Sequence, residues 1–446
     1  MVKTAREAAL VVLERCRRDK AFSDTLLNSV IRSSELSAKD SALAVNLCYG
    51  VLQNMYLCDF YIDYYTSPNV KLEPKLRDIL RLSVYQILFL DRIPPHAAVS
   101  EGVELCKKCG LGRASGLANA VLRRLVVNKD KLPEIPKESI EKYLSVKYST
   151  PPSLVELFIA EFGVKFAQDF LQANNAVVPM TIQVNTLKTS EDELYHMLQS
   201  RAITVKRHAF LPGALDISGA GNIAEFPEHK AGLFYVQDAA SRLAVVAAGL
   251  KVGDLLLDAC AAPGGKSFAA AIAMKNKGRI LSCDINEGKL KRIVEGALSL
   301  SLDCVSTSQM DAKNPNNCLF GAFDVVLADV PCSGFGIIRK KPDIRYKDLS
   351  EIKKLPETQL AILNGLSSCV KDGGVLLYSS CTVLKRENSE VIDAFLSRNG
   401  EFSREAFTLP SPLGSIESGE LTLFPHIHDT DGFYICKLRK AGRRGK

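Results

Sequence analysis

The sequence contains no apolar run long enough to cross a membrane, since no stretch approaches the roughly 18 apolar residues that a spanning helix needs. The apolar run near the N-terminus is short and is broken by Glu7 and Glu14, which argues against a signal peptide and a transit peptide. Pro/Gly-rich and repeated segments are also missing, so neither disorder nor a solenoid is expected. We therefore expect a folded cytoplasmic protein.

The pairings that would indicate a disulfide framework or a zinc site are missing as well. The 13 cysteines are scattered through 446 residues, which favours buried, reduced thiols over disulfides. The C-x-x-C pair of Cys106 and Cys109 has no second pair and no nearby histidine. His426 and His428 have neither a cysteine nor a third histidine beside them. We expect no bound metal.

Basic residues cluster in two segments, although the formal net charge of +7 is modest. Residues 437–446 carry six basic and no acidic side chains, and residues 339–348 carry five basic and two acidic ones. Such clusters favour an anionic polymer as the partner. A solvated tail and a solvated loop are the alternatives for either segment taken alone.

Residues 4–127 show a helical pattern, because apolar residues recur there at spacings of three and four. This pattern predicts an all-α helical bundle. Pro133 and Pro136 interrupt it and indicate a linker. The stretch from 150 to 233 mixes a helical pattern with strand-like runs, which predicts a small α+β module.

From Phe234 onward, short continuous apolar strands alternate with helices. Such strands indicate a parallel sheet covered on both faces, so we expect a doubly wound, Rossmann-like α/β domain that binds its ligand beyond the carboxyl ends of the strands. The expected domains are 1–130 (helical bundle), 131–149 (linker), 150–233 (α+β module), 234–440 (α/β domain) and 441–446 (basic tail).

The first strand of this domain ends at Asp258 and runs into CAAPGGKS, residues 260–267. The stretch partly matches a phosphate-binding loop, since its Gly-Lys-Ser end is in place and the later run DVVLAD imitates the metal-binding strand of nucleoside triphosphatases. However, Cys260 stands where the first glycine is needed for the tight backbone turn. A nucleoside triphosphatase is therefore the disfavoured alternative.

A nucleoside ligand without a pyrophosphate fits this edge better. Gly264 and Gly265 let the backbone approach a ligand closely, and Asp284 ends the next strand, where a carboxylate can accept from ribose hydroxyls. The absence of G-x-G-x-x-G argues against a dinucleotide. S-adenosylmethionine, which offers ribose, adenine and an amino-acid end, is the predicted cofactor. Asp311 could accept from the adenine amino group, with a surface turn as the alternative.

Two cysteines follow the next two strands. Cys332 stands in DVPCSGFG and Cys381 in YSSCT. Carbon 5 of a pyrimidine is a poor nucleophile until a thiolate adds at carbon 6, so the pair predicts methylation at carbon 5. A free thiol has a pKa of about 8.5, and we expect Lys266 or the basic segment after Cys332 to favour the thiolate. A buried structural thiol is the alternative for either cysteine alone.

The motifs DACAAPGGKS, DVPCSGFG and YSSCT resemble the signatures of the RNA 5-methylcytosine methyltransferases. The helical part, notably LRLSVYQILFLDRIPPHAAVSEGVEL and NAVLRRL, resembles the NusB-type RNA-binding domain. Together they resemble the bacterial RsmB (Sun/Fmu) ribosomal RNA methyltransferases over nearly the whole chain. The later motif usually reads Thr-Cys-Ser and here is Ser380-Cys381-Thr382, which keeps a hydroxyl on each side.

This resemblance implies transfer of a methyl group from S-adenosylmethionine to carbon 5 of one cytosine in 16S rRNA. It also implies that Cys381 is the nucleophile and that Cys332 helps to release the covalent adduct by aiding loss of the carbon 5 proton. Asp329 is implied to hydrogen-bond the target cytosine as well. The implied cofactor-binding residues are Cys260, Ala261, Ala262, Pro263, Gly264, Gly265, Lys266, Asp284, Asp311 and Asp329.

The expected partner is 16S rRNA, free or early in small-subunit assembly, and the expected protein is a monomer that needs neither a membrane nor a metal. The target base must leave its stack, so we expect the helical domain and the α+β module, whose QVNTLK resembles the family's substrate-side segment, to grip the surrounding RNA. Two alternatives stay open: cytosine-5 methylation of another rRNA or tRNA site, and a noncatalytic RNA-binding assembly factor.

Overall fold

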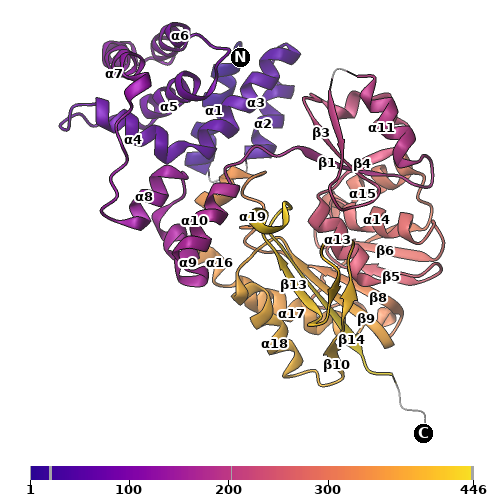
Figure 1. Cartoon of the computed structure of the whole chain (residues 1–446). Helices are drawn as coiled ribbons and strands as arrows, with labels where there is room; N and C mark the ends of the chain where they lie inside the picture. Colours follow the sequence, from indigo (N-terminus) through magenta and orange to yellow (C-terminus); the bar gives the residue numbers. More distant parts are fainter. Residues whose placement is uncertain (1, 20–22, 202, 443–446) are drawn as a thin grey trace. The chain divides into compact units, whose positions relative to one another are not determined.

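The computed structural model describes residues 2–19, 23–201 and 203–442 and divides into two compact units (Figure 1). The first unit extends to Asn175 and also contains Lys340–Lys347. The second unit consists of Ala176–Arg339 and the chain from Asp348 onward. The basic tail expected at 441–446 lies mostly outside the described residues.

The first unit is helical, as the apolar spacing predicts. Ala8, Ala9 and Val12 lie on one face of the first helix and are fully buried in its core. Ser37 caps the third helix, because its side chain accepts the backbone N–H of Asp40. The helices are α1 (Ala5–Asp19), α2 (Ser23–Arg32), α3 (Ala38–Gln53), α4 (Met55–Tyr65), α5 (Pro74–Phe89), α6 (Pro95–Lys108), α7 (Ser115–Val127), α8 (Ile140–Lys147), α9 (Pro152–Phe162) and α10 (Val164–Ala173).

The compact units differ from the domain boundaries expected from the sequence. The expected linker holds α8, and α8 to α10 belong to the first unit together with the helical bundle. Hydrogen bonds join these parts: Ser149 Oγ accepts from Leu57 N at 3.1 Å, and Gln53 Nε2 donates to Asn175 O at 2.9 Å. The prolines in 131–149 interrupt the helical pattern, but the residues before and after this segment still contact each other within one compact unit.

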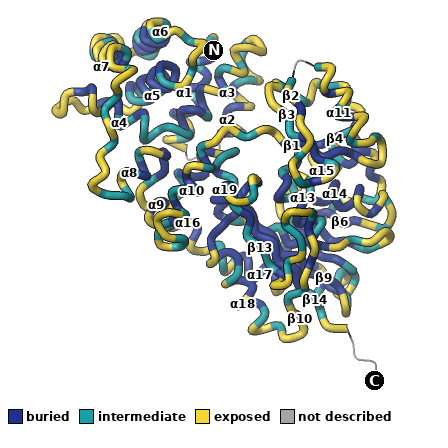
Figure 2. The backbone as a smooth tube through the Cα atoms, in the orientation of Figure 1, coloured by how far each residue is buried: buried dark blue, intermediate teal, exposed yellow. Residues whose placement is uncertain are grey.

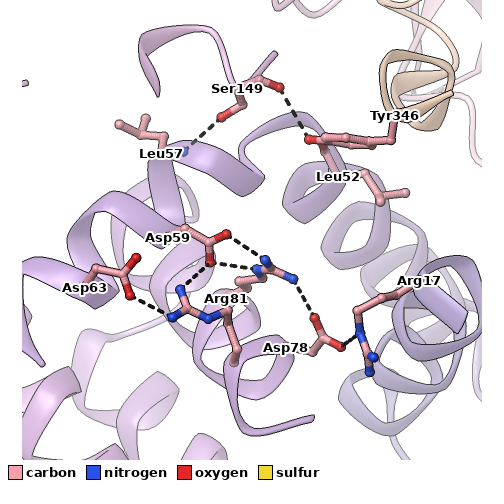
Figure 3. A network of polar contacts seen from close by, with 10 residues as sticks. Arg17, Leu52, Leu57, Asp59, Asp63, Asp78, Arg81, Ser149 and Tyr346 are labelled. Atoms are coloured by element: carbon pink, nitrogen blue, oxygen red, sulfur yellow. Dashed lines mark hydrogen bonds and ion pairs between the residues drawn. The ribbon is translucent and has the colours of Figure 1, made fainter. Parts of the chain in front are cut away.

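A network of charged side chains ties three helices of this unit together (Figure 3). Arg81 of α5 donates to Asp59 of α4 at 2.6 Å and to Asp78 of its own helix at 2.7 Å. Arg17 of α1 approaches the other oxygen of Asp78 at 3.2 Å. Burial raises the pKa of Asp78, whose side chain is only 2% exposed, and the two arginines oppose that rise.

The inserted segment Lys340–Lys347 places a buried cation inside the first unit. Arg345 is 1% exposed, and burial lowers its pKa below the usual arginine range. Its neighbour Tyr346 donates its hydroxyl to Leu52 O at 2.6 Å (Figure 3). The Arg345 guanidinium donates to Gln53 O at 3.2 Å, Tyr148 O at 2.9 Å, Ser149 O at 3.0 Å and Asn175 Oδ1 at 2.9 Å.

The second unit begins with a small antiparallel sheet in the order β2-β3-β1-β4. Its strands are β1 (Met180–Val184), β2 (Thr204–Arg207), β3 (Ala214–Ser218) and β4 (Phe234–Val236), and its helices are α11 (Glu191–Gln199) and α12 (Pro227–Lys230). Ser190 and Glu193 form a capping box that fixes the start of α11. The predicted α+β character of this module is confirmed.

An eight-stranded sheet forms the rest of the second unit, in the order β10-β14-β9-β8-β5-β6-β7 with β13 also paired to β14. Strands β5 to β9 are parallel, as predicted, and β14 is antiparallel to β9. The strands are β5 (Leu255–Asp258), β6 (Arg279–Asp284), β7 (Val305–Gln309), β8 (Phe323–Asp329), β9 (Val370–Ser380), β10 (Phe402–Arg404), β13 (Glu420–Leu423) and β14 (Phe433–Lys440). A short hairpin, β11 (Phe407–Thr408) with β12 (Ser415–Ile416), lies outside this sheet.

Helices cover both faces of this sheet, so its parallel strands are buried as their continuous apolar runs predict. Along β8, Val325 and Leu327 pack with α13 to α15, whereas Val326 and Ala328 pack with α17 and α18. In Figure 2 most of β8 and β9 is dark blue, the colour of buried residues. The helices are α13 (Ala239–Ala248), α14 (Gly265–Ala273), α15 (Glu287–Leu300), α16 (Leu349–Ile352), α17 (Leu355–Ser367), α18 (Ser389–Leu396) and α19 (Pro425–His428).

Among the described residues, none of the helices has the length and apolar character needed to traverse a bilayer.

We predict that Arg345→Met destabilises the first unit by about 2–4 kcal/mol, because it leaves buried carbonyl oxygens without donors. The measurement is denaturant unfolding followed by circular dichroism. The matched control is Arg123→Met, which removes an exposed arginine bonded to Asn119 on its own helix and should change stability by less than about 0.5 kcal/mol. Equal stabilities of the two variants would contradict the role given to Arg345.

Candidate active site

The carboxyl ends of the parallel strands bring acidic and sulfur side chains to one edge of the large sheet. Strands β5 and β8 are neighbours, although β6 and β7 follow β5 in the sequence, so the strand order reverses between them. Asp258 ends β5 and Asp329 ends β8 at this reversal. Ligands of doubly wound sheets bind at such a point.

The loop from Cys260 to Lys266 connects β5 to α14. Its backbone is tied to β6, because Ala261 N donates to Cys283 O at 2.7 Å. Gly264 has a φ of +112°, and a Cβ there would lie 2.5 Å from the Phe268 ring. Only glycine fits this position, so the loop can turn tightly into the N-terminus of α14.

Asp258 holds the chain just after this loop through a hydrogen bond, a role that the sequence analysis did not assign. The carboxyl group is fully buried and accepts from Ser267 Oγ at 2.7 Å, and Ser267 in turn accepts from Ser282 Oγ at 2.7 Å. Burial raises the pKa of Asp258 to about 6. Within the described residues, its Oδ1 is buried and has no hydrogen-bond partner. The feature in the sequence that could have indicated this role is the acidic residue at the end of the first apolar strand of the domain.

Asp284 and Asp311 are held by the backbone with one oxygen each. Asp284 Oδ1 accepts from Asn286 N at 2.9 Å, and Asp311 Oδ1 accepts from Lys313 N at 3.0 Å. No hydrogen bond to the Oδ2 atom of either residue is present in the described part of the chain. A carboxylate fixed through one oxygen can accept ligand hydroxyl or amino groups through the other. These hydrogen-bond acceptors therefore fit the hydroxyl and amino groups of the nucleoside part of S-adenosylmethionine.

Lys266 and Asp329 form a mostly buried ion pair between α14 and the end of β8. Lys266 Nζ lies 2.6 Å from Asp329 Oδ2, and Ser379 Oγ of β9 donates to Asp329 Oδ1 at 2.8 Å. Lys266 Nζ also lies 5.2 Å from the centroid of the Phe433 ring. The carboxylate is thus fixed in place, and each oxygen keeps a second lone pair for a substrate.

The two cysteines are brought together, as the strand ends predict. Cys332 Sγ lies 3.1 Å from Cys381 Sγ, and both residues are half-buried. The thiol contact with Cys381, followed by burial, raises the pKa of Cys332 well above the ordinary thiol value. Cys260 is a separate thiol, whose pKa is also raised by burial. A reaction that needs two adjacent sulfur atoms can therefore take place here.

Lys266 and the two arginines of the basic segment, which were expected to favour the thiolate, are engaged with other groups. Lys266 is paired with Asp329, and Arg339 is paired with Asp431 at 2.6 Å. Arg345 of the same basic segment is buried within the first unit. The charges that act on Cys332 after its thiol neighbour and burial are acidic, from Glu387 and Asp329. Clustering in the sequence did not show which acids would neutralise these cations.

A set of buried polar residues lies behind the two cysteines, and the sequence analysis assigned no role to Gln359 or Glu387 among them. They share full burial and hydrogen bonds to the cysteine loops, and they are Ser333, Gln359, Thr382 and Glu387. Gly336 adds a backbone link, because its N donates to Cys381 O at 2.9 Å and its O accepts from Gly432 N at 2.8 Å.

Comparisons with known families divide the chain into three matches. The model described as "16S rRNA methyltransferase RsmB/F" matches residues 245–439, and that of the NusB family matches residues 3–127. The model described as the RsmF/B-like methyltransferase, ferredoxin-like domain matches residues 150–224. The resemblances predicted for the helical part and for the three motifs are confirmed.

Relatives resemble the chain over its whole length. It is 36% identical to a probable ribosomal RNA small subunit methyltransferase B of Bacillus subtilis (strain 168), with 99% of this chain and 100% of the relative covered. It is 32% identical to the protein of the same description from Synechocystis sp., with 98% and 100% covered. The crystal structure of PH0851 matches with a TM-score of 0.80 and 26% identity, covering 99% of this chain and 100% of that one.

We predict that Gly336→Ala destabilises the second unit by about 1–3 kcal/mol, because a Cβ would lie 1.9 Å from Gly432 O and the backbone would have to move. Denaturant unfolding measures the change. Gly400→Ala is the control, since a Cβ at that position meets no atom within 4 Å. Wild-type stability of Gly336→Ala would show that the packing of the two cysteine loops is looser than described.

Proposed function

Since the chain belongs to the RsmB/F family of 16S rRNA methyltransferases, we propose that it transfers a methyl group from S-adenosylmethionine to carbon 5 of a cytosine in 16S rRNA. The observation that carries this proposal is the 3.1 Å contact between the sulfur atoms of Cys332 and Cys381. A transfer to an exocyclic amine needs no thiol, because the amine is already nucleophilic. Carbon 5 of cytosine needs one, and the structure offers two side by side.

The proposed roles follow from the chemistry of the adduct. Cys381 Sγ adds to carbon 6, and the electron pair of the carbon 5–carbon 6 double bond moves to carbon 5, which becomes able to take a methyl group. Cys332 then aids loss of the carbon 5 proton, the double bond re-forms, and the bond from sulfur to carbon 6 breaks. Asp329, held by Lys266 and Ser379, would accept a hydrogen bond from the cytosine amino group.

S-adenosylmethionine would supply an electrophilic methyl group. We propose that the loop of residues 260–266 lies against it, that Asp284 accepts from its ribose hydroxyls and that Asp311 accepts from its adenine amino group. Lys266 would act through Asp329, with which it is paired. The fixed Oδ1 atoms of Asp284 and Asp311 support these assignments.

The helical residues 3–127 are proposed to bind the rRNA that surrounds the target, in keeping with their match to the NusB family. The target cytosine must be unstacked to reach the two thiols, at a cost of about a few kcal/mol that is lowest in loops and bulges. A monomer that works in the cytoplasm on free or early-assembly 16S rRNA remains the expectation.

We predict that Cys332→Ala accumulates a denaturant-stable adduct with 16S rRNA, because release is impaired while addition proceeds. Cys381→Ala should form no adduct and should be inactive, because nothing adds to carbon 6. Gel electrophoresis under denaturing conditions detects the adduct, and bisulfite sequencing of the rRNA detects 5-methylcytosine and its position. Cys318→Ala, which changes an exposed free cysteine, is the control and should behave as wild type. The reverse result would exchange the two roles.

We predict that Asp284→Ala weakens binding of S-adenosylmethionine about 10–100-fold, which corresponds to about 1.4–2.8 kcal/mol for hydrogen bonds to a charged group. Isothermal titration calorimetry measures the affinity, with the exposed Asp303→Ala as the control. If the wild-type protein bound 16S rRNA but no S-adenosylmethionine, a noncatalytic assembly factor would replace the proposed enzyme.

A further inference from the structure

A buried carboxylate lies behind the two cysteine loops. Glu387 ends the short helical turn Lys385–Glu387 that follows β9, and it is fully buried. Its backbone is held as well, since Tyr378 of β9 donates its hydroxyl to Glu387 O at 2.5 Å. Tyr378 is itself fully buried. The carboxylate therefore has a fixed position relative to the end of β9.

Glu387 accepts hydrogen bonds from both cysteine loops. Its Oε2 accepts from the backbone N of Ser333 at 2.8 Å, and its Oε1 lies 3.4 Å from the hydroxyl of Thr382. Ser333 directly follows Cys332, and Thr382 directly follows Cys381. One carboxylate thus holds the residue after each thiol, and so it fixes the distance between the two loops.

Two further contacts close this arrangement around Cys332. Gln359 Nε2 donates to Glu387 Oε2 at 3.1 Å and also to Pro331 O at 3.0 Å, so the residue before Cys332 is held through the same carboxylate. Ser333 Oγ donates to Thr382 Oγ1 at 2.8 Å, which links the two loops directly. Ser333, Gln359 and Thr382 are all fully buried.

The charge of Glu387 acts on Cys332 through this buried environment. Its oxygens accept from backbone and amide N–H groups and from a hydroxyl. After the Cys381 contact and burial, the charges of Cys381 and Glu387 contribute to the raised pKa of Cys332, because a nearby negative charge disfavours a thiolate.

We propose that Glu387 is a positioning residue that holds Cys332 against Cys381 and keeps Cys332 as a thiol, so that Cys381 alone adds to the base. This inference rests on the proposed methyl transfer to carbon 5. It accounts for how a site with two adjacent sulfur atoms uses only one of them as the nucleophile. Glu387 acts through the cysteine loops and is not proposed to contact the base.

The protons balance in this scheme. In one concerted step, the sulfur of Cys332 takes up the carbon 5 proton while its own thiol proton passes to the sulfur of Cys381, which is its neighbour at 3.1 Å. The electron pair of the bond between carbon 5 and its hydrogen re-forms the double bond, and the bond from carbon 6 to the Cys381 sulfur breaks. The net result is a proton moved from carbon 5 to Cys381 through Cys332. Cys381 then loses this proton to solvent before it adds again as a thiolate, and this is the one proton that the overall methyl transfer releases. Cys332 ends the cycle as the thiol that it was at the start.

The first test measures Cys332 without RNA, in a Cys381→Ala background. Alkylation of Cys332 by iodoacetamide is followed across a pH series by peptide mass spectrometry. With Glu387 intact, we expect the midpoint to lie above the ordinary thiol value of about 8.5. The added Glu387→Gln change should raise the rate of alkylation at pH 8 about tenfold, equal to about one unit in the midpoint. Glu390→Gln, an exposed neighbour on α18, should change nothing.

The second test measures methyl transfer with both cysteines present. Glu387→Gln places an amide, which has only one accepting oxygen, where Ser333 and Thr382 both donate, so the two cysteine loops should lose their fixed positions. We therefore expect kcat to fall about 100-fold. The KM for 16S rRNA and the affinity for S-adenosylmethionine should change less than about threefold. Glu387→Asp keeps the charge but shortens the reach. It should lower kcat and leave the alkylation midpoint of Cys332 where it is in the parent.

The outcomes separate this inference from the proposed function. A Cys332 midpoint at or below about 8.5 with Glu387 intact overturns the inference even if the Glu387 variants fail to fold. An unchanged midpoint in a folded Glu387→Gln protein, confirmed by its melting curve, also overturns it. Methyl transfer that persists in Cys381→Ala would instead defeat the proposed roles of the cysteines, and the alkylation series would still decide whether Glu387 governs Cys332.

Discussion

Parallel pairing of β8 with β9 sets Asp329 directly opposite Ser379, and the candidate site depends on this register. Because the two strands end at the same edge, Cys332, three residues beyond Asp329, and Cys381, two residues beyond Ser379, leave the sheet side by side. A shift of one residue would turn every side chain of one strand to the opposite face and separate the two thiols. The burial of both strands under helices on both faces opposes such a shift.

The polar side chains around this edge are arranged in two layers. At the ends of the strands, Lys266 pairs with Asp329, which fixes the carboxylate and leaves lone pairs on it that can accept further hydrogen bonds. Deeper in the domain, Asp258 and Glu387 are fully buried and hold loops through serine, glutamine and backbone donors. The deeper carboxylates fix the positions of the loops, whereas the nearer groups are the ones proposed to contact substrate and cofactor.

The sequence predicted those features that depend on local pattern. Helical spacing, the continuous strands and the residues at strand ends identified the fold class and brought Asp284, Asp329, Cys332 and Cys381 to one sheet edge. The remainder depends on contacts between distant segments. The ion pair of Arg339 with Asp431 and the hydrogen bond from Ser333 to Glu387 form only in the folded chain, and no spacing in the sequence indicates either one. The basic segment was therefore expected to contact an anionic polymer or to favour the thiolate, and no role was assigned to the carboxylate behind the thiols.

The insertion of Lys340–Lys347 into the first unit has a consequence for how proteins of this architecture can exchange parts. The chain passes between the units after Asn175, before Lys340 and after Lys347, so no single crossover point separates them. A recombinant that replaced the helical half up to Asn175 would replace the residues that accept hydrogen bonds from Arg345. A chimera that keeps these contacts must therefore take both the segment up to Asn175 and the segment Lys340–Lys347 from the same parent, although the two are encoded far apart.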